Sequence, residues 1–526
     1  MKLVAAEQLD LLVLGSGVAG LSAAVRAAGV HGMRVGVLTK AELHQATTRW
    51  AQGGVAAVLG GADPDSTDLH LADTLAAGDG LCDADAVRVL VDEGPARVHE
   101  LIALGAAFDL DEHGELARAR EGGHSRARIV HAGGAATGVE VERALVEACR
   151  STAAALYEGW FAVDLIVEGG RCGGVVAVDG AGAPVEVRAA NVLVATGGAG
   201  QLYAVTTNPA EATGDGVAMA LRAGVAVADV EFVQFHPTAL HHPAMPRPLL
   251  SEALRGHGAL LRDTNGDRFV DELLPRDKVS RAITGRMLEQ GVEHLWLDAT
   301  GLERFGERFP TIAAALAEIG LDPATDWLPI SPAAHYFCGG IVADLDGASS
   351  LPGLWAAGET ACNGVMGANR LASNSLLDGM VFAPRAVEAI EQGKVGPDAT
   401  GAMRAVLQHE PAPLIPGRAI DVPPAEPVAP SGADPAKSRD ALQRAMTEHA
   451  GVLRSAASLA VADGAARQSL ADAAAGDGAA AHELLNLATV ARAVIAAATV
   501  REETRGAHTR TEFPAADDGF RVRLVL

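Results

Sequence analysis

The chain has 526 residues, which predicts about three domains at roughly 150 residues per domain. Hydrophobic residues make up 49% of it, so disorder caused by low hydrophobicity is excluded for most of the chain. Lys and Arg number 42 against 66 Asp and Glu, a net charge of −24 that argues against partners such as nucleic acid or an anionic membrane surface. A site for a small anion would have to gather arginines against this overall charge.

The five cysteines are scattered and never form a CxxC pair, so neither a disulfide framework nor a cysteine-based metal site is expected. The first ten residues lack the long apolar segment of a signal peptide. No run of about 18 uninterrupted apolar residues predicts a membrane span. We therefore expect a reduced, cytoplasmic protein with no membrane contact and no bound metal.

The N-terminal residues predict a strand, a glycine turn, a helix and a second strand. The apolar run 11–14 is followed by Gly15-Ser16-Gly17-Val18-Ala19-Gly20, a helical stretch to residue 28 and a strand at 34–38. A GxGxxG turn between a strand and a helix places free backbone N–H groups where they can bind a pyrophosphate. This context favours dinucleotide binding over glycines that only serve strand–helix packing.

One expected feature of a dinucleotide site is missing. The second strand ends in Thr39-Lys40 instead of the acid that binds a ribose hydroxyl. Two later apolar runs, 192–195 and 353–357, also end at glycines. Three such junctions predict one long cofactor, such as FAD, with Asp215 and Glu359 as replacements for the missing acid.

These patterns predict an α/β fold built on an interrupted Rossmann-like domain. Residues 1–236 and 341–410 form this domain, and 237–340 form an inserted α+β segment. Residues 411–435 contain eight prolines and predict an extended linker. Residues 436–526 follow as a C-terminal helical domain, with two or three helices between 437 and 503.

Longer motifs in the same regions resemble the flavoprotein family of fumarate reductase, succinate dehydrogenase and L-aspartate oxidase. They are Ala51-Gln52-Gly53-Gly54, Thr213-Gly214-Asp215-Gly216, Gln234-Phe235-His236-Pro237-Thr238, Gly367-Ala368-Asn369-Arg370 and Ser373-Asn374-Ser375-Leu376. The phrases 120–125, 332–336 and 503–508 are most similar to the L-aspartate oxidase branch. The resemblance implies a FAD-binding domain, a capping domain at 237–340 and a C-terminal helical domain.

The resemblance also implies how FAD is held. Respiratory members link FAD covalently to a histidine five residues before the Gln-Gly-Gly motif. Thr47 occupies this position, so noncovalent FAD is expected. The expected FAD contacts are Gly15, Ser16, Gly17, Gly20, Thr39, Lys40, Gln52, Gly53, Gly54, Asp215, Glu359, Ser375 and Leu376.

For the substrate, the resemblance places His236, His335 and Arg370 on the two carboxylates of a four-carbon dicarboxylate. Ser251 and Glu252 match a Thr-Glu pair of the dehydrogenases, and Gln234 is a further candidate for substrate binding. Taken alone, each histidine would more often be a hydrogen-bonded structural residue.

Two further residues carry the expected chemistry. Glu121 suits a substrate with an ammonium group. The alternative interpretation is that Glu121 is a solvated acid in a loop. Arg276 resembles the family's proton-transferring arginine. Because a guanidinium is a poor base, this role needs a neighbouring carboxylate, and the alternative is a third anion contact.

The function implied is FAD-dependent oxidation of L-aspartate to iminoaspartate, with O₂ or fumarate as electron acceptor. This is the first step of de novo NAD biosynthesis, and its unstable product would pass to quinolinate synthase as a partner. The alternative is a soluble fumarate reductase or succinate dehydrogenase flavoprotein subunit. A catalytically inactive flavoprotein used for assembly is disfavoured by the presence of Arg276, His335 and Arg370.

Overall fold

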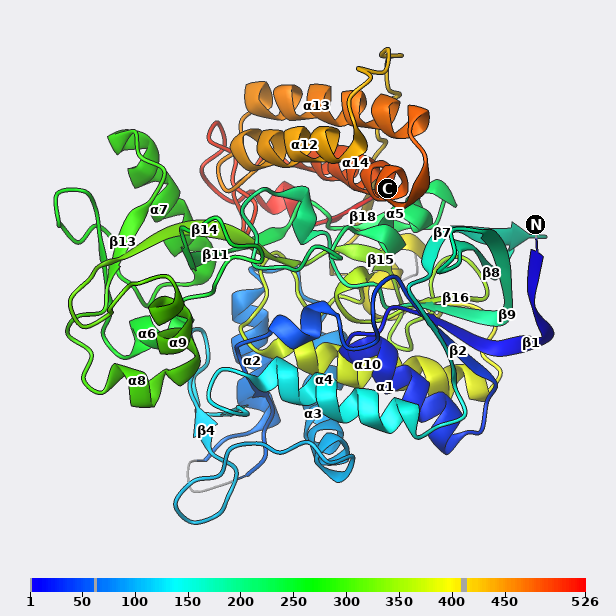
Figure 1. Ribbon diagram of the computed structural model, residues 1–526, viewed down its shortest axis with the longest axis horizontal. Helices are drawn as coiled ribbons and strands as arrows, with labels where there is room; N and C mark the ends of the chain where they lie inside the picture. The colour runs from blue at the N-terminus through cyan, green and yellow to red at the C-terminus, as the bar shows by residue number, and fades with distance from the viewer. Residues whose placement is uncertain (1, 61–63, 408–413) are drawn as a thin grey trace.

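The computed structural model describes residues 2–60, 64–407 and 414–526 and has an α/β architecture (Figure 1). Residues 408–410 of the predicted first domain and 411–413 of the predicted linker lie outside these ranges. Figure 1 shows three regions: the main sheet and its helices, a lobe at the left, and a layer of helices at the top.

The main sheet has seven strands in the order β6-β2-β1-β9-β8-β7, with β16 paired to β9. Its parallel part comprises β1 (Lys2–Leu14), β2 (Val35–Thr39), β6 (Ala155–Glu158), β9 (Pro184–Val194) and β16 (Leu354–Ala356). The strands β7 (Phe161–Glu168) and β8 (Arg171–Val178) continue it as an antiparallel meander. Apolar residues 11–14 are buried at its centre, as expected for a strand covered on both faces.

Helices cover both faces of this sheet. Below it in Figure 1 lie α1 (Val18–Ala24), α2 (Thr67–Ala77), α3 (Ala84–Ala103), α4 (Thr137–Arg150) and α10 (Asn374–Glu391). The predicted first helix continues past α1 as a π-helical segment, η1 (Val25–Val30). On the other face, α5 (Asp215–Arg222) packs between β7 and the C-terminal helices. The Rossmann-like prediction is thus confirmed.

The lobe at the left of Figure 1 is an α+β unit with its own hydrophobic cluster. Its antiparallel sheet has the order β11-β14-β13-β12, made by β11 (Val233–Leu240), β12 (Leu260–Arg262), β13 (Leu295–Asp298) and β14 (Leu328–Phe337). Its helices are α6 (Glu252–Gly256), α7 (Arg276–Gln290), α8 (Phe305–Arg308) and α9 (Pro310–Glu318). The predicted borders at 236/237 and 340/341 fall inside strands, because β11 and β15 (Gly340–Val342) run across them.

Two smaller sheets join distant parts of the chain. The first has the order β17-β15-β10-β19-β18 and includes β10 (Val227–Ala228), β17 (Ala361–Cys362), β18 (Gly417–Ala419) and β19 (Arg523–Val525). The second comprises β3 (Val55–Ala56), β4 (Arg118–Ala119) and β5 (Ile129–Val130). The remaining short elements are η2 (Thr47–Trp50), η3 (Gly200–Leu202), η4 (Gly358–Thr360), η5 (Gly401–Met403), α11 (Arg404–Leu407) and η6 (Asp518–Phe520).

The C-terminal layer contains the three expected helices, α12 (Pro435–His449), α13 (Ala456–Ala475) and α14 (Gly478–Val500). By length and composition α14 could cross a membrane, but 72% of its apolar window is buried within the protein. Residues 501–526 are not α-helical and return to the first domain, where β19 pairs with β10. Buried ion pairs hold this tail, including Arg501 with Glu231 at 2.6 Å and Arg523 with Asp229.

Candidate active site

A cavity of about 410 Å³ lies between the glycine turn after β1 and the β11–β14 lobe. The predicted site residues come together around it, although they are spread over most of the chain. All of them line the cavity except Gly20 and Gln234. The cavity is also lined by Thr47, Thr48, Trp160, Thr207, Arg247 and Tyr336.

The glycine turn fits closely against the neighbouring strand. Gly15 has φ +104°, and a Cβ there would lie 2.3 Å from the carbonyl oxygen of Ala195. A Cβ on Gly20 would lie 2.1 Å from the carbonyl oxygen of Gly15, so Gly20 serves packing of the turn rather than lining the cavity. At the start of α1, the Val18 N–H donates to Thr48 Oγ1 at 2.8 Å.

Lys40 lies in the cavity wall with all three of its donors engaged. Its ammonium contacts Thr213 Oγ1 at 2.6 Å, Asp215 Oδ2 at 2.9 Å and Glu483 Oε1 at 2.7 Å. Burial lowers the pKa of Lys40, but the two carboxylates outweigh it and the pKa is raised overall. Lys40 therefore orients Asp215 and ties β2 to α14, and Asp215 also accepts from Asn486.

Other cavity residues leave atoms available to a large polar cofactor. Gln52 Oε1 is buried and has no partner among the described residues. Burial raises the pKa of Glu359 to about 7, although its carboxyl accepts the Phe337 N–H at 2.9 Å. The close-packed glycines and these polar atoms fit the FAD predicted for this cavity. Ser375, also a predicted FAD contact, accepts from Arg370 Nη1 at 3.1 Å.

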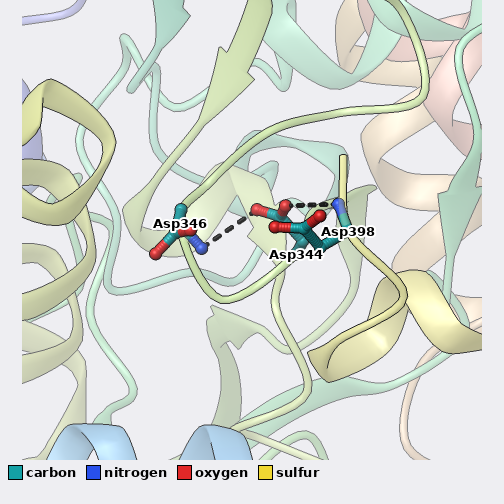
Figure 2. Close-up of side chains that lie close together, drawn as sticks. All are labelled: Asp344, Asp346 and Asp398. Atoms are coloured by element: carbon teal, nitrogen blue, oxygen red, sulfur yellow. Dashed lines mark hydrogen bonds between the residues drawn. The ribbon is translucent and has the colours of Figure 1, made fainter. Parts of the chain in front are cut away.

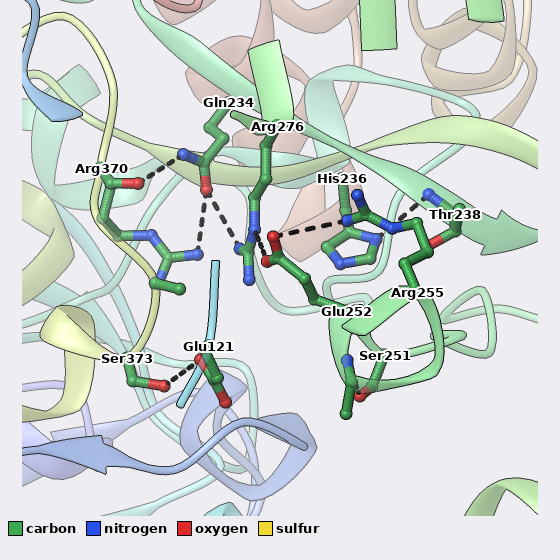
Figure 3. Close-up of polar contacts among 12 residues, drawn as sticks. Glu121, Gln234, His236, Thr238, Ser251, Glu252, Arg255, Arg276, Arg370 and Ser373 are labelled. Carbon is green, nitrogen blue, oxygen red and sulfur yellow. Dashed lines mark hydrogen bonds and ion pairs between the residues drawn. The ribbon is translucent and has the colours of Figure 1, made fainter. Parts of the chain in front are cut away.

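Gln234 lies behind two arginines and joins them (Figure 3). Its Oε1 accepts from Arg370 Nη2 at 3.0 Å and from Arg276 Nη1 at 3.4 Å. Its Nε2 donates to Arg370 O and Asn369 Oδ1, both at 2.8 Å. Gln234 is fully buried and does not line the cavity, so it positions the two guanidinium groups.

Arg276 begins α7 and faces Glu252 at the start of α6. Its Nε donates to Glu252 Oε2 at 2.8 Å, and Arg255 lies 3.6 Å from the other oxygen. Burial acts to raise the pKa of Glu252, but Arg276 and Arg255 outweigh it and lower the pKa. The predicted carboxylate neighbour of Arg276 is thus in place. Ser251 lines the cavity, and its hydroxyl also caps α6 by accepting the Ala253 N–H.

The two predicted histidines lie side by side, with ring centroids 5.3 Å apart. His236 Nδ1 accepts from the Thr238 N–H, and its buried Nε2 has no partner among the described residues. Burial and then the nearby cations hold the pKa of both histidines well below the usual range. Neutral His236 therefore offers a free N–H donor, and Thr207 holds His335 Nδ1 at 2.7 Å.

The guanidinium of Arg370 lies on the ring of Tyr336, 4.6 Å from its centroid. Burial and the charge of Arg276 lower the pKa of Arg370 to about 10, so it stays charged at neutral pH. Its buried Nε, like that of Arg247, has no partner among the described residues. A dicarboxylate would supply the missing acceptors and offset the repulsion between the two arginines.

Glu121 lies in the cavity wall, where two polar side chains hold it. Ser373 Oγ donates to Glu121 Oε2 at 2.6 Å, and His131 Nε2 lies 3.3 Å from Oε1. Glu121 is therefore a largely buried, hydrogen-bonded acid and not a solvated loop residue. Ser373 stands inside a motif used for the family resemblance, whereas nothing in the sequence singled out His131 or Arg247.

A separate group of carboxylates lies away from this cavity (Figure 2). Asp344, Asp346 and Asp398 bring oxygens within 4.8 Å of one another. The Lys394 ammonium contacts all three, at 2.6, 2.8 and 2.7 Å. The negative charge of the cluster is thus partly offset by Lys394, and Arg385 adds a second contact to Asp346 at 2.7 Å.

Comparisons with known proteins agree with this geometry. A model of the FAD binding domain matches residues 10–376, and one of the fumarate reductase flavoprotein C-terminus matches 439–523. L-aspartate oxidase of Streptomyces coelicolor is 49% identical over 98% of this chain and 91% of its own length. The enzyme of that name from Mycobacterium tuberculosis H37Rv is 44% identical over 96% and 92%. A mutant FrdA chain of E. coli quinol fumarate reductase superposes with a TM-score of 0.83 at 30% identity, covering 98% of this chain and 93% of that one.

Proposed function

Since the chain belongs to the L-aspartate oxidases of the FAD-binding fumarate reductase flavoprotein family, we propose that its cavity holds FAD noncovalently and oxidises L-aspartate to iminoaspartate. One observation carries the assignment of the substrate site. The cavity presents the arginines joined by Gln234 together with the hydrogen-bonded carboxylate of Glu121. This combination is complementary to two carboxylates and one ammonium group.

In the proposed complex, Arg370 and Arg276 face the substrate carboxylates and the neutral histidines donate to them. The Nε2–H of His236 and the Nε–H of Arg370, which have no partner within the described part of the chain, are available for this contact. An arginine fork matches a carboxylate in two parallel hydrogen bonds and fixes its orientation. Glu121 accepts from the ammonium and so fixes which carbon faces the cofactor.

The reaction removes a hydride from Cα and a proton from the amino group. A bound FAD would supply the hydride acceptor. The proton passes to the Arg276–Glu252 pair, whose 2.8 Å contact gives the guanidinium the neighbouring carboxylate that proton transfer requires. The β11–β14 lobe covers the substrate and excludes water.

The same family membership supports a place in NAD biosynthesis from aspartate. The electron acceptor is O₂, giving hydrogen peroxide, or fumarate, giving succinate. We place the enzyme in the cytoplasm and propose that its unstable product is passed to quinolinate synthase. Thr47, which lines the cavity, supports noncovalent FAD because a threonine hydroxyl cannot form the histidyl link.

The test is flavin reduction in the absence of oxygen. Purified yellow protein is mixed with L-aspartate or, in a parallel sample, with succinate, and the flavin absorbance is followed. We expect rapid bleaching by aspartate; bleaching by succinate alone would show that the alternative flavoprotein subunit is correct. Acid precipitation of the same sample should leave FAD in the supernatant, and flavin remaining on the polypeptide would contradict noncovalent binding.

A further inference from the structure

We propose that Ser373 and His131 are specificity-determining positioning residues that hold the Glu121 carboxylate as a fixed acceptor for the substrate's ammonium group. The proposal rests on the proposed function, because only an amino dicarboxylate needs this acceptor. Neither residue has to touch the substrate; each acts through Glu121.

The three side chains come from separate parts of the fold. Glu121 follows β4, His131 follows β5 and Ser373 immediately precedes α10. Glu121 is only 11% exposed, and its two oxygens have different partners: Ser373 Oγ at 2.6 Å on Oε2 and His131 Nε2 at 3.3 Å on Oε1. Figure 3 shows the Glu121–Ser373 contact on the side of the site opposite Gln234.

These contacts leave Glu121 able to accept more hydrogen bonds. An ionised carboxylate offers about four lone-pair sites, and the two contacts use two of them. Burial acts to raise the pKa of Glu121, but His131, Ser373 and Arg276 outweigh it and lower the pKa to about 2. The group is therefore a carboxylate at neutral pH, held in one orientation, with acceptor capacity left for an ammonium.

Ser373 has a backbone conformation that is unfavourable for a residue with a side chain. Ser373 has φ +60° and ψ 6°, a left-handed conformation that glycine adopts without strain. Non-glycine residues in this region are strained, and they concentrate at functional sites. The carbonyl of Ser373 accepts the Ala56 N–H at 3.0 Å, which keeps the segment in this conformation and its hydroxyl on Glu121.

The position of Glu121 connects it to the reacting groups. A Cβ on Gly122 would lie 2.0 Å from Glu252 Oε1, so the backbone after Glu121 packs directly on the partner of Arg276. A Cβ on Gly53 would lie 3.6 Å from Glu121 Oε1, which places the carboxylate beside the Gln52-Gly53-Gly54 loop. An ammonium bound to Glu121 would thus lie between the predicted flavin loop and the proposed proton acceptor.

The decisive experiment compares substrates with and without an ammonium group. KM and kcat are measured for aspartate oxidation by O₂, and KM for fumarate with the chemically reduced enzyme. In Ser373→Gly, which removes the hydroxyl and relieves the backbone strain, we expect KM for aspartate to rise about tenfold, as for loss of a hydrogen bond to a charged group. In the same variant, KM for fumarate should change by less than about twofold.

His131 is tested by a pair of variants. His131→Gln keeps an N–H donor and should stay near the wild-type KM for aspartate, whereas His131→Phe should raise it severalfold. Glu121→Gln serves as the positive control and exposed Ser151→Ala as the matched negative control.

Each outcome decides the proposal. An unchanged KM for aspartate in Ser373→Gly, or equal increases for aspartate and fumarate, would overturn it, since the second result indicates a general structural role. Failure of the proposed function looks different: the wild-type enzyme itself would then bleach with succinate and not with aspartate.

Discussion

Arg276 has two contacts of different kinds, and both bear on catalysis. It donates to the Glu252 carboxylate at 2.8 Å and to the Gln234 amide oxygen at 3.4 Å. A lysine in its place has a single ammonium and cannot reproduce this fork. The Arg276 side chain therefore contributes its positive charge and also fixes the arrangement of its two hydrogen-bond contacts.

We expect Arg276→Leu to reduce the rate of flavin bleaching by aspartate at least ~100-fold, the usual size of general acid–base catalysis. The bleaching rate of Arg276→Lys should lie between that of Arg276→Leu and that of the wild type. Stopped-flow absorbance on FAD-loaded protein measures this, with Arg444→Leu on the exposed face of α12 as the control. A retained bleaching rate in Arg276→Leu with FAD bound would rule out an essential proton-transfer role.

A second residue-scale prediction concerns pH. Asp378 in α10 is buried, its single described side-chain partner is Asn363 at 2.7 Å, and burial raises its pKa to about 7 from the usual 3.8. Because the folded state holds this proton more tightly than the unfolded chain, the stabilisation is complete below pH 3.8 and is lost as pH rises through about 7. The slope from one such group is at most ~1.4 kcal/mol per pH unit.

Between pH 5 and pH 8 the free energy of unfolding of the wild type should therefore fall relative to that of Asp378→Asn, which lacks this titration. Urea unfolding of the FAD-loaded protein at the two pH values measures the difference. Asp472→Asn is the control, because hydrogen bonds lower the pKa of Asp472 and its titration lies below this window. Parallel pH dependence in Asp378→Asn and wild type would contradict the prediction.

At the scale of elements, Lys394 joins the segment after α10 to the turn that follows β15. It lies among Asp344, Asp346 and Asp398, and Asp344 is fully buried. Removing one partner of a buried ion pair leaves an uncompensated charge.

Lys394→Met should therefore lower the free energy of unfolding by about 2 kcal/mol, below the ~3–5 kcal/mol of a fully buried pair, because Asp346 is partly exposed and Asp398 is exposed. Denaturant unfolding measures the loss, with Lys437→Met on the surface of α12 as the matched control. Equal stability of the two variants would mean that the cluster contributes nothing.

Elements with a local pattern could be predicted, and pairings between distant segments could not. The strand at 11–14, the glycine turn and three C-terminal helices follow from apolar periodicity and from Gly and Pro positions. By contrast, β19 is three residues long and is defined by its partners β10 and β18, which lie far away in the sequence. The return of residues 501–526 to the first domain therefore has no local signal.

The same distinction applies to the site. His236, His335, Arg276 and Arg370 stand in motifs, and the structure brings them to one cavity. Gln234 was a candidate for substrate contact but lies behind the arginines, a difference that only the fold reveals. Their individual roles remain predictions.

At the scale of the whole molecule, the C-terminal layer reaches the proposed cofactor cavity through Lys40. Lys40 pairs with Asp215 beside the cavity and with Glu483 of α14, and Glu483 also pairs with Arg439 of α12. The helical layer is therefore part of the electrostatics of this cavity.

Lys40→Met should weaken FAD binding at least tenfold, because Asp215 and Glu483 would then lose a shared cationic partner beside an anionic cofactor. Fluorescence titration of the FAD-free protein with FAD measures Kd, and Lys278→Met on α7 is the matched control. An unchanged Kd would show that the pair is unrelated to the cofactor.

The strand β19 has a consequence for how the protein is made. It lies inside the five-stranded sheet β17-β15-β10-β19-β18, and Arg523 pairs with Asp229, 294 positions earlier in the chain. A ribosome synthesises the chain from its N-terminus at roughly 5–20 residues per second, and domains fold as their residues emerge. This sheet can close only after residue 525 has left the exit tunnel, so β10 and β18 must wait for their common partner β19 until nearly all of the chain has been translated.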